Sequence, residues 1–328
     1  MDSSIYKIFV NLQQKETINR DSFLAAPLPF TQNHKIGISP EGYPMFFIEC
    51  NNTNHSLDIN LEFISVFFNR TCRLSEGNKQ FDSVYTIISL KTENIDFQQY
   101  FLEVVCIMLK QLPENPSHKQ LKMEIQKLIE LFSCFNRPPR KTIQGLWAEL
   151  FVIEQAKDPE YMIQSWHSSP DDKFDFNDGQ DKIEVKSTSK TRRVHNFALE
   201  QLNPNSNSNL LIASVFVIQV GQGKNIFSLV DSIRKRFQNL QLQFRLDEIL
   251  SQILGNNIDK ISDVYFDYQQ AIDTLVFFDY RDIPTINNDN IPEEISNVHL
   301  DCDLSHIVTI KNKTFDISHS QLFRSLYI

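Results

Sequence analysis

Glycine is scarce in this chain, with 8 in 328 residues. Glycine-rich phosphate-binding loops and collagen-like repeats depend on that residue, so neither is expected here. Cysteines form no C-x-x-C pair, and the histidines show no metal-ligand spacing, so no disulfide framework and no zinc site are predicted. Scattered cysteines without a pairing pattern predict that the protein is located in a reducing cytoplasm. They are Cys50, Cys72, Cys106, Cys134 and Cys302.

Long apolar runs are also lacking. The longest, residues 210–218, is far shorter than the roughly 20 residues needed to cross a bilayer, so no membrane contact is expected. Residues 1–16 carry no signal-peptide pattern. The formal net charge of −9 argues against general binding of polyanions. Any contact with nucleic acid must therefore come from a local basic patch.

Hydrophobic periodicity divides the chain into three predicted parts. Residues 1–138 form a strand-rich and then helical module for recognition, dimerisation or docking. Residues 139–240 form a central α/β core, and residues 241–328 form a C-terminal α/β extension packed on it. Within the core, the pattern predicts a helix over about 142–156 and a strand over 162–167. The fold class expected from this order is mixed α/β.

The most informative segment of the core reads as a β-hairpin. A two-residue loop at Gly179-Gln180 sets Asp175 opposite Glu184, because glycine suits the turn position with positive φ. The alternative loop Asp178-Gly179 shifts the pairing but keeps both carboxylates on one face, whereas a three-residue loop would separate them. Side-chain alternation then gives the hairpin an apolar face, made of Phe174, Phe176, Ile183 and Val185.

The polar face of this hairpin has the groups needed to hydrolyse a phosphodiester with a metal ion. Two carboxylates at cross-strand distance repel each other unless a cation lies between them. Asp175, Glu184 and the backbone carbonyl of Val185 would supply the oxygen ligands that Mg²⁺ prefers. Lys186 would orient or deprotonate a water molecule. The alternative is a surface hairpin with ordinary salt bridges.

Two neighbouring segments add to the hairpin. In the helix before it, Glu149 lies at the edge of the apolar arc, and Glu154 lies inside that arc as a second candidate. A basic cluster follows the hairpin directly, and its functional interpretation is contact with nucleic-acid phosphates. A solvated charged loop is the alternative. The cluster comprises Lys190, Arg192, Arg193 and His195.

Four sequence blocks, in this order, resemble the PD-(D/E)XK nuclease superfamily, and more closely a bacterial group found near restriction and phage-defence genes. The blocks are Gly145–Leu150, Phe174–Phe176, Glu184–Thr188 and Arg192–Leu202. The resemblance implies a restriction-endonuclease-like core, in which a central mixed sheet is flanked by helices.

The resemblance also assigns roles to residues. It implies Asp175 and Glu184 as metal ligands, Lys186 as the catalytic lysine and Glu149 as the helix carboxylate. Gln201 matches the polar residue after the hairpin and joins the predicted nucleic-acid contacts. The literal Pro-Asp dipeptide ends at Asp171, in a Ser-Ser-Pro loop. We prefer Asp175 as the first ligand, and Asp171 remains the alternative.

These observations together predict a Mg²⁺-dependent DNA endonuclease of restriction or defence type, in which Mn²⁺ can substitute. The expected partners are DNA, other proteins of a defence operon and a second copy of the chain. The runner-up is a nuclease-fold subunit that binds DNA or a partner protein without cutting. A weaker third option is a nuclease that acts on RNA or in repair.

Overall fold

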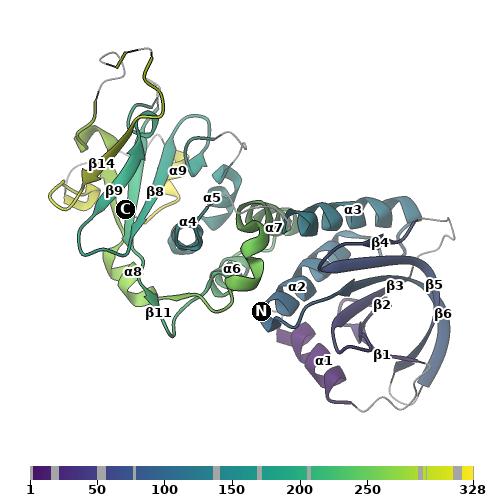
Figure 1. The fold of residues 1–328 in the computed structure, drawn as a ribbon. Helices are drawn as coiled ribbons and strands as arrows, with labels where there is room; N and C mark the ends of the chain where they lie inside the picture. Colours follow the sequence, from purple (N-terminus) through teal and green to yellow (C-terminus); the bar gives the residue numbers. More distant parts are fainter. Residues whose placement is uncertain are drawn as a thin grey trace. The chain divides into compact units, whose positions relative to one another are not determined.

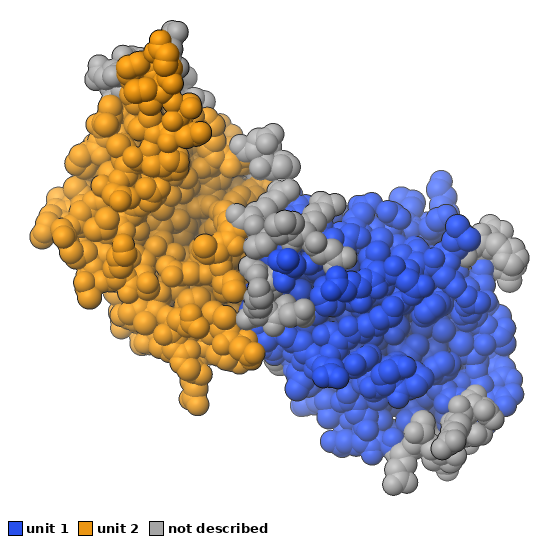
Figure 2. Space-filling model, in the orientation of Figure 1, with its two compact units in different colours: residues 1–140, 239–262 blue, residues 141–238, 263–328 orange. Residues whose placement is uncertain are grey.

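The computed structural model describes residues 3–15, 22–49, 57–76, 79–135, 141–167, 172–204, 208–286, 291–292, 294–312 and 320–327. The chain folds as two compact units (Figure 2). Unit 1 comprises residues 1–140 and 239–262, and unit 2 comprises residues 141–238 and 263–328. The division drawn from the sequence kept 241–328 together. In the structure, 239–262 groups with the N-terminal unit instead.

Unit 1 is built on a closed sheet, visible in Figure 1 as a barrel. Its strands run in the order β1-β2-β3-β6-β5-β4, and β1 also pairs in parallel with β5. That last pairing closes the ring and removes the free edges of the strands it joins. The strands are β1 (Phe23–Leu28), β2 (Thr31–Ile38), β3 (Pro44–Glu49), β4 (Ile59–Asn60), β5 (Ile64–Glu76) and β6 (Lys79–Leu90).

Helices pack on this barrel through a phenylalanine-rich core. Phe97 and Phe132 stack with ring centroids 5.9 Å apart, and Phe46 of β3 contacts Phe101. Phenylalanines therefore form much of the core of this unit, where they contribute large buried apolar areas. The helices are α1 (Ser3–Gln13), α2 (Ile95–Gln111), α3 (His118–Cys134) and α7 (Leu240–Leu254), followed by the 3₁₀ turn η2 (Gly255–Lys260).

Unit 2 carries a four-stranded mixed sheet in the order β13-β10-β8-β7. The central pair β10 and β8 is parallel, and the outer strands are antiparallel to their neighbours. The strands are β7 (Phe176–Asn177), β8 (Lys182–Thr188), β10 (Leu210–Phe216) and β13 (Val276–Asp279). Two short ribbons flank the sheet: β9 (Val194–Ala198) with β14 (His299–Asp303), and β11 (Gln219–Val220) with β12 (Tyr265–Phe266).

Helix α4 packs against β8, α5 and α6. The helices of this unit are α4 (Ile143–Gln155), α5 (Pro159–Ser165), α6 (Ile226–Arg234), α8 (Tyr268–Thr274) and α9 (Gln321–Arg324). The 3₁₀ turns are η1 (Leu199–Gln201), η3 (Tyr280–Asp282) and η5 (Ile310–Asn312). A mixed sheet with helices packed against it confirms the mixed α/β class and is consistent with the nuclease-like core that the resemblance implies.

One predicted element is wrong. The strand expected over 162–167 is largely the helix α5, because Asp158 caps its N-terminus and Pro159 occupies its first position, which suits proline. Extended backbone begins only at Trp166, which forms a bridge with Phe176. Among the helices of the described ranges, none has both the length and the apolar character required to span a membrane.

Candidate active site

The hairpin has the register predicted from the sequence. Phe176 pairs with Ile183 and Asn177 with Lys182, which are the pairs expected from the Gly179-Gln180 loop, and Asp175 lies in the bend just before β7. The backbone NH of Asp178 donates to the carbonyl of Asp181, which leaves Gly179-Gln180 as the two-residue loop. Gly179 has φ +90°, a conformation that glycine adopts without a steric penalty.

Both faces of the hairpin are largely buried. Phe174, Phe176 and Ile183 are buried as expected, whereas Val185 is only half-buried. The charged face is just as enclosed, since Asp175 is 5 % exposed and Glu184 is 4 % exposed. These carboxylates are therefore not the solvated salt-bridge partners of an ordinary surface hairpin. Buried charges need a specific partner.

Helix α4 adds a third buried carboxylate. Its N-terminus is fixed by Thr142, whose side chain accepts a hydrogen bond from Gly145 N. Gln144 Nε2 donates to Ser187 Oγ on β8 at 3.1 Å, which ties the first turn of the helix to the sheet. One turn later, Glu149 lies 2 % exposed. The helix carboxylate proposed from the sequence is thus brought to Asp175.

Three residues that the sequence analysis missed hold this carboxylate. Lys141 Nζ lies 2.5 Å from Glu149 Oε1 and also contacts Asp175 Oδ1. On the other oxygen, Glu149 Oε2 accepts from Trp166 Nε1 and lies 2.8 Å from His167 Nε2. Lys141 stands just before the cap of α4, two turns ahead of Glu149, which is the one local signal that could have indicated it.

Potential metal-ligand atoms gather around the same carboxylates. Three potential ligand atoms, one each from Glu149, His167 and Asp175, lie within 4.8 Å of one another. This group shares Asp175 with the predicted ligand set but contains Glu149 and His167 in place of Glu184. A nitrogen and several carboxylate oxygens form a donor set that suits divalent cations.

Asp175 is also anchored to the next strand. Its Oδ2 accepts a hydrogen bond from Val185 N at 2.8 Å. In a strand, the NH and C=O of one residue point to the same side, so the Val185 carbonyl also faces away from β10 and toward this edge. The backbone oxygen suggested as a ligand thus lies on the same edge as Asp175.

Glu184 forms the second half of the site together with Lys186 and Gln201. Glu184 Oε1 lies 2.8 Å from Lys186 Nζ and 2.6 Å from Gln201 Nε2. Gln201 Oε1 in turn accepts from Lys186 Nζ at 2.9 Å and from Ala198 N at 3.1 Å. Gln201, predicted as a nucleic-acid contact, therefore bridges the lysine and the glutamate. Glu184 Oε2 is buried and has no hydrogen-bond partner among the described residues.

The pKa values of the three buried carboxyl groups are shifted in different directions. Burial, with the nearby Asp175, raises the pKa of Glu184 to about 8. Burial and the Glu149 carboxylate also raise the pKa of Asp175, despite Lys141. Burial alone would raise the pKa of Glu149 too, but Lys141 and His167 outweigh it, so the net shift is downward. In turn, Asp175 and Glu149 raise the pKa of Lys141 against the effect of its own burial. The ammonium of Lys141 therefore stays charged between these two carboxylates.

The basic cluster divides into two exposed and two engaged residues. Lys190 and Arg192 are exposed, although Arg192 pairs with Asp303. Arg193 donates to Ser214 Oγ at 2.8 Å and to the backbone carbonyls of Ser214 and Thr274. His195 is 3 % exposed and lies 2.7 Å from Ser214 Oγ, so its side chain has no open surface for phosphate.

Burial and the nearby Lys186 and Arg193 lower the pKa of His195 to about 4, so the ring is neutral at physiological pH. The alternative helix carboxylate, Glu154, is bound elsewhere, by Lys224 and Tyr268. Asp171, the other candidate for the first ligand, lies outside the described residues.

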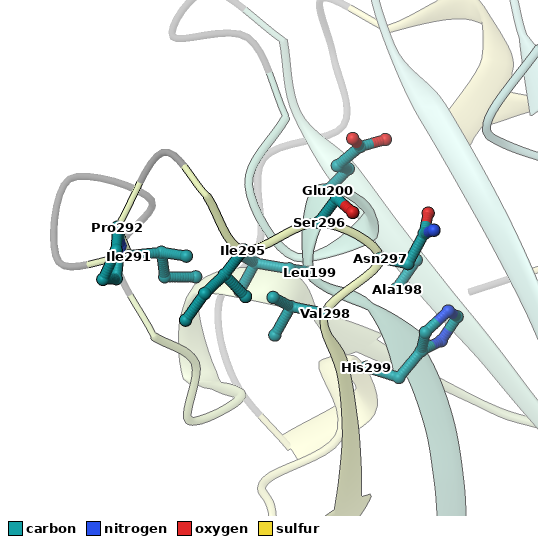
Figure 3. A pocket seen from close by; sticks show the side chains of 10 residues that line it. All are labelled: Ala198, Leu199, Glu200, Ile291, Pro292, Ile295, Ser296, Asn297, Val298 and His299. Carbon is teal, nitrogen blue, oxygen red and sulfur yellow. The ribbon is translucent and has the colours of Figure 1, made fainter.

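A hollow of about 470 Å³ borders the turn that carries Gln201 (Figure 3). One part of its wall is apolar and another presents Glu200, Asn297 and His299. It is lined by Ala198, Leu199, Glu200, Ile291, Pro292, Ile295, Ser296, Asn297, Val298 and His299. The backbone of β9 and η1 thus connects this hollow to the Lys186–Glu184 pair.

A mixed sheet whose hairpin gathers Asp, Glu and Lys beside a helix glutamate defines a nuclease-like class of protein. The chain belongs to the PD-(D/E)XK family, because residues 6–305 match the model of the family described as "Putative PD-(D/E)XK family member, (DUF4420)". No curated protein and no solved structure gave a match. PD-(D/E)XK nucleases generally use divalent metal ions, and the buried donors described above fit such an ion.

Proposed function

We propose that this chain is a Mg²⁺-dependent endonuclease that hydrolyses DNA phosphodiester bonds, with Mn²⁺ able to substitute. The observation that carries the proposal is Glu184 Oε2, a carboxylate oxygen buried without a partner beside Asp175. A buried acceptor of this kind is costly unless a ligand satisfies it. Asp175, Glu184 and the Val185 carbonyl would hold the ion, which would polarise the phosphate and its attacking water.

The chain's own residues would position the remaining reactants. Lys186 is held by Glu184 and Gln201, and its Nζ lies 4.9 Å from the centroid of the Phe197 ring, so its ammonium has a fixed direction. From there it would orient the attacking water and stabilise charge developing on the phosphate. The water oxygen bonds to phosphorus, the bond to the leaving oxygen breaks, and a proton passes to that oxygen.

The nucleic-acid surface in this proposal is smaller than the sequence suggested. Lys190 and Arg192 are exposed and would contact backbone phosphates, where each charge adds affinity that falls with salt. Arg193 and His195 would instead support the site by fixing β9 to β10 through Ser214. Gln201 would act on Lys186 more than on DNA.

The biological setting is part of the same proposal. A bacterial restriction or phage-defence system fits the resemblance noted in the sequence, with defence-operon proteins or a second copy of the chain as partners. The cytoplasm fits the cysteines, since Cys72, Cys106, Cys134 and Cys302 are free thiols.

The test compares nicking of supercoiled DNA in Mg²⁺ by the wild type, Glu184→Gln and Lys186→Met. Both substitutions keep side-chain size and remove charge, and we expect each to reduce cleavage by at least about a hundredfold. Glu200→Gln is the matched control, because Glu200 is an exposed glutamate on the neighbouring turn. Equal cleavage by all four proteins would eliminate the catalytic assignment.

A non-cleaving subunit is the second candidate, and one contact favours it. Lys141 already gives both the Glu149 and the Asp175 carboxylate a cationic partner, which a metal ion would otherwise supply. This candidate predicts that the purified chain does not cleave and that its binding to DNA, or to a partner protein, survives Glu184→Ala.

A further inference from the structure

The ammonium of Lys141 lies where a cation is needed. It contacts one oxygen of Glu149 and one of Asp175, the two carboxylates that, with His167, bring ligand atoms within 4.8 Å of one another. A divalent ion cannot lie between these two oxygens while the ammonium does, because the two cations would repel each other at short range in a poorly solvated place.

We propose that Lys141 is a built-in cation that takes the place of a second divalent ion between Glu149 and Asp175. The site then holds one metal ion per chain, on the Glu184 side. This inference rests on the proposed function, in which Asp175, Glu184 and Val185 hold the first ion.

The distribution of open donor atoms supports a single ion. Both oxygens of Glu149 are occupied, one by Lys141 and the other by Trp166 and His167. Glu184 Oε2, by contrast, is buried and has no partner among the described residues. Asp175 accepts from Lys141 on Oδ1 and from Val185 N on Oδ2. Among the three carboxylates, the oxygen left open by the described residues is therefore Oε2 of Glu184.

The net charge of the site also favours a single divalent ion. Three carboxylates, of Glu184, Glu149 and Asp175, lie beside two ammonium groups, of Lys141 and Lys186, so in the ion-bound site the protein contributes a single net negative charge. One divalent ion together with one bridging phosphodiester brings this set to neutrality. A second divalent ion would leave an excess of positive charge in a buried site, which is unfavourable.

The experiment counts Mn²⁺ bound to the metal-free full chain, by electron paramagnetic resonance of the free ion and by calorimetry. We expect one ion in the wild type, two in Lys141→Met and one in Lys141→Arg, which keeps the charge. We also expect pulsed resonance to detect nitrogen coupling from His167 in Lys141→Met and none in the wild type. Two ions in the wild type, or no gain in Lys141→Met, would overturn the inference.

Three further variants separate this inference from the proposed function. Glu184→Gln should lose the resident ion, and adding Lys141→Met to it should restore binding of one ion, now beside Glu149. If the wild type binds no ion, the proposed function fails, while the gain on replacing Lys141 still decides the inference.

Glu149→Gln leaves Lys141 in place and should keep the number of bound ions at one. A count of zero there would make Glu149 a ligand of the resident ion and refute the role of Lys141.

Discussion

Replacing Glu184 by glutamine should stabilise the metal-free protein at high pH. The pKa of Glu184 is raised from 4.5 to about 8 by burial and by Asp175, so the folded state holds a proton that the unfolded state releases. A raised pKa of this kind contributes stability that is full below about pH 4.5 and is lost as the pH rises through 8. At about 1.4 kcal/mol per pKa unit, the loss for this one group between pH 5 and pH 9 is roughly 4 kcal/mol.

Glutamine imitates the protonated carboxyl and does not titrate. The free energy of unfolding of Glu184→Gln should therefore exceed that of the wild type by an amount that grows by roughly 4 kcal/mol from pH 5 to pH 9 in EDTA. Urea denaturation followed by tryptophan fluorescence is the assay. The chain's two tryptophans, Trp147 and Trp166, are both fully buried in unit 2, so the signal reports the unit that contains Glu184.

The exposed Glu200 provides the control, since Glu200→Gln should follow the wild type at every pH. If Glu184→Gln and the wild type show parallel pH dependence, Glu184 is ionised without a metal ion. The reasoning from burial would then be refuted.

Other substitutions test individual contacts. Trp166→Phe removes the donor to the buried Glu149 and should lower the free energy of unfolding by about 1–3 kcal/mol in a thermal melt, so an unchanged melt would contradict that role. Gly223→Ala should lower the melting temperature by several degrees, because its Cβ would lie 2.2 Å from the carbonyl oxygen of Phe266, and a tolerated alanine would disprove the close approach. Gln201→Ala should slow DNA cleavage by about 10–100-fold and also lower the melting temperature, since Gln201 positions Lys186 and bonds the buried Glu184, and full activity would argue against that positioning.

The hairpin and its neighbours could be predicted because their signals are local. Gly179 fixes the turn and alternation fixes the faces, and the helix predicted over about 142–156 is observed as Ile143–Gln155. Helix α5 was mistaken for a strand because its apolar residues, such as Met162 and Ile163, occur in a segment too short to show helical periodicity.

The missed parts of the site depend on tertiary structure. Lys141 and His167 reach Glu149 from opposite ends of a helical segment, and no spacing rule links a lysine and a histidine over such a distance. In the same way, the exposed and buried members of the basic cluster have similar sequence surroundings. Only the position of Ser214 on β10 reveals that Arg193 and His195 are engaged in the interior.

Residues 239–262 pack with the N-terminal unit although they follow most of the second unit's core in the sequence, and this order affects folding during translation. Helix α7 packs on α2 and α3, so the apolar faces of those helices remain uncovered until α7 has been synthesised. During translation, the ribosome must therefore release almost a hundred residues of the second unit before the first is complete. A fragment that stops at residue 140 would lack this helix, so expression in two separate pieces should yield an aggregating first half.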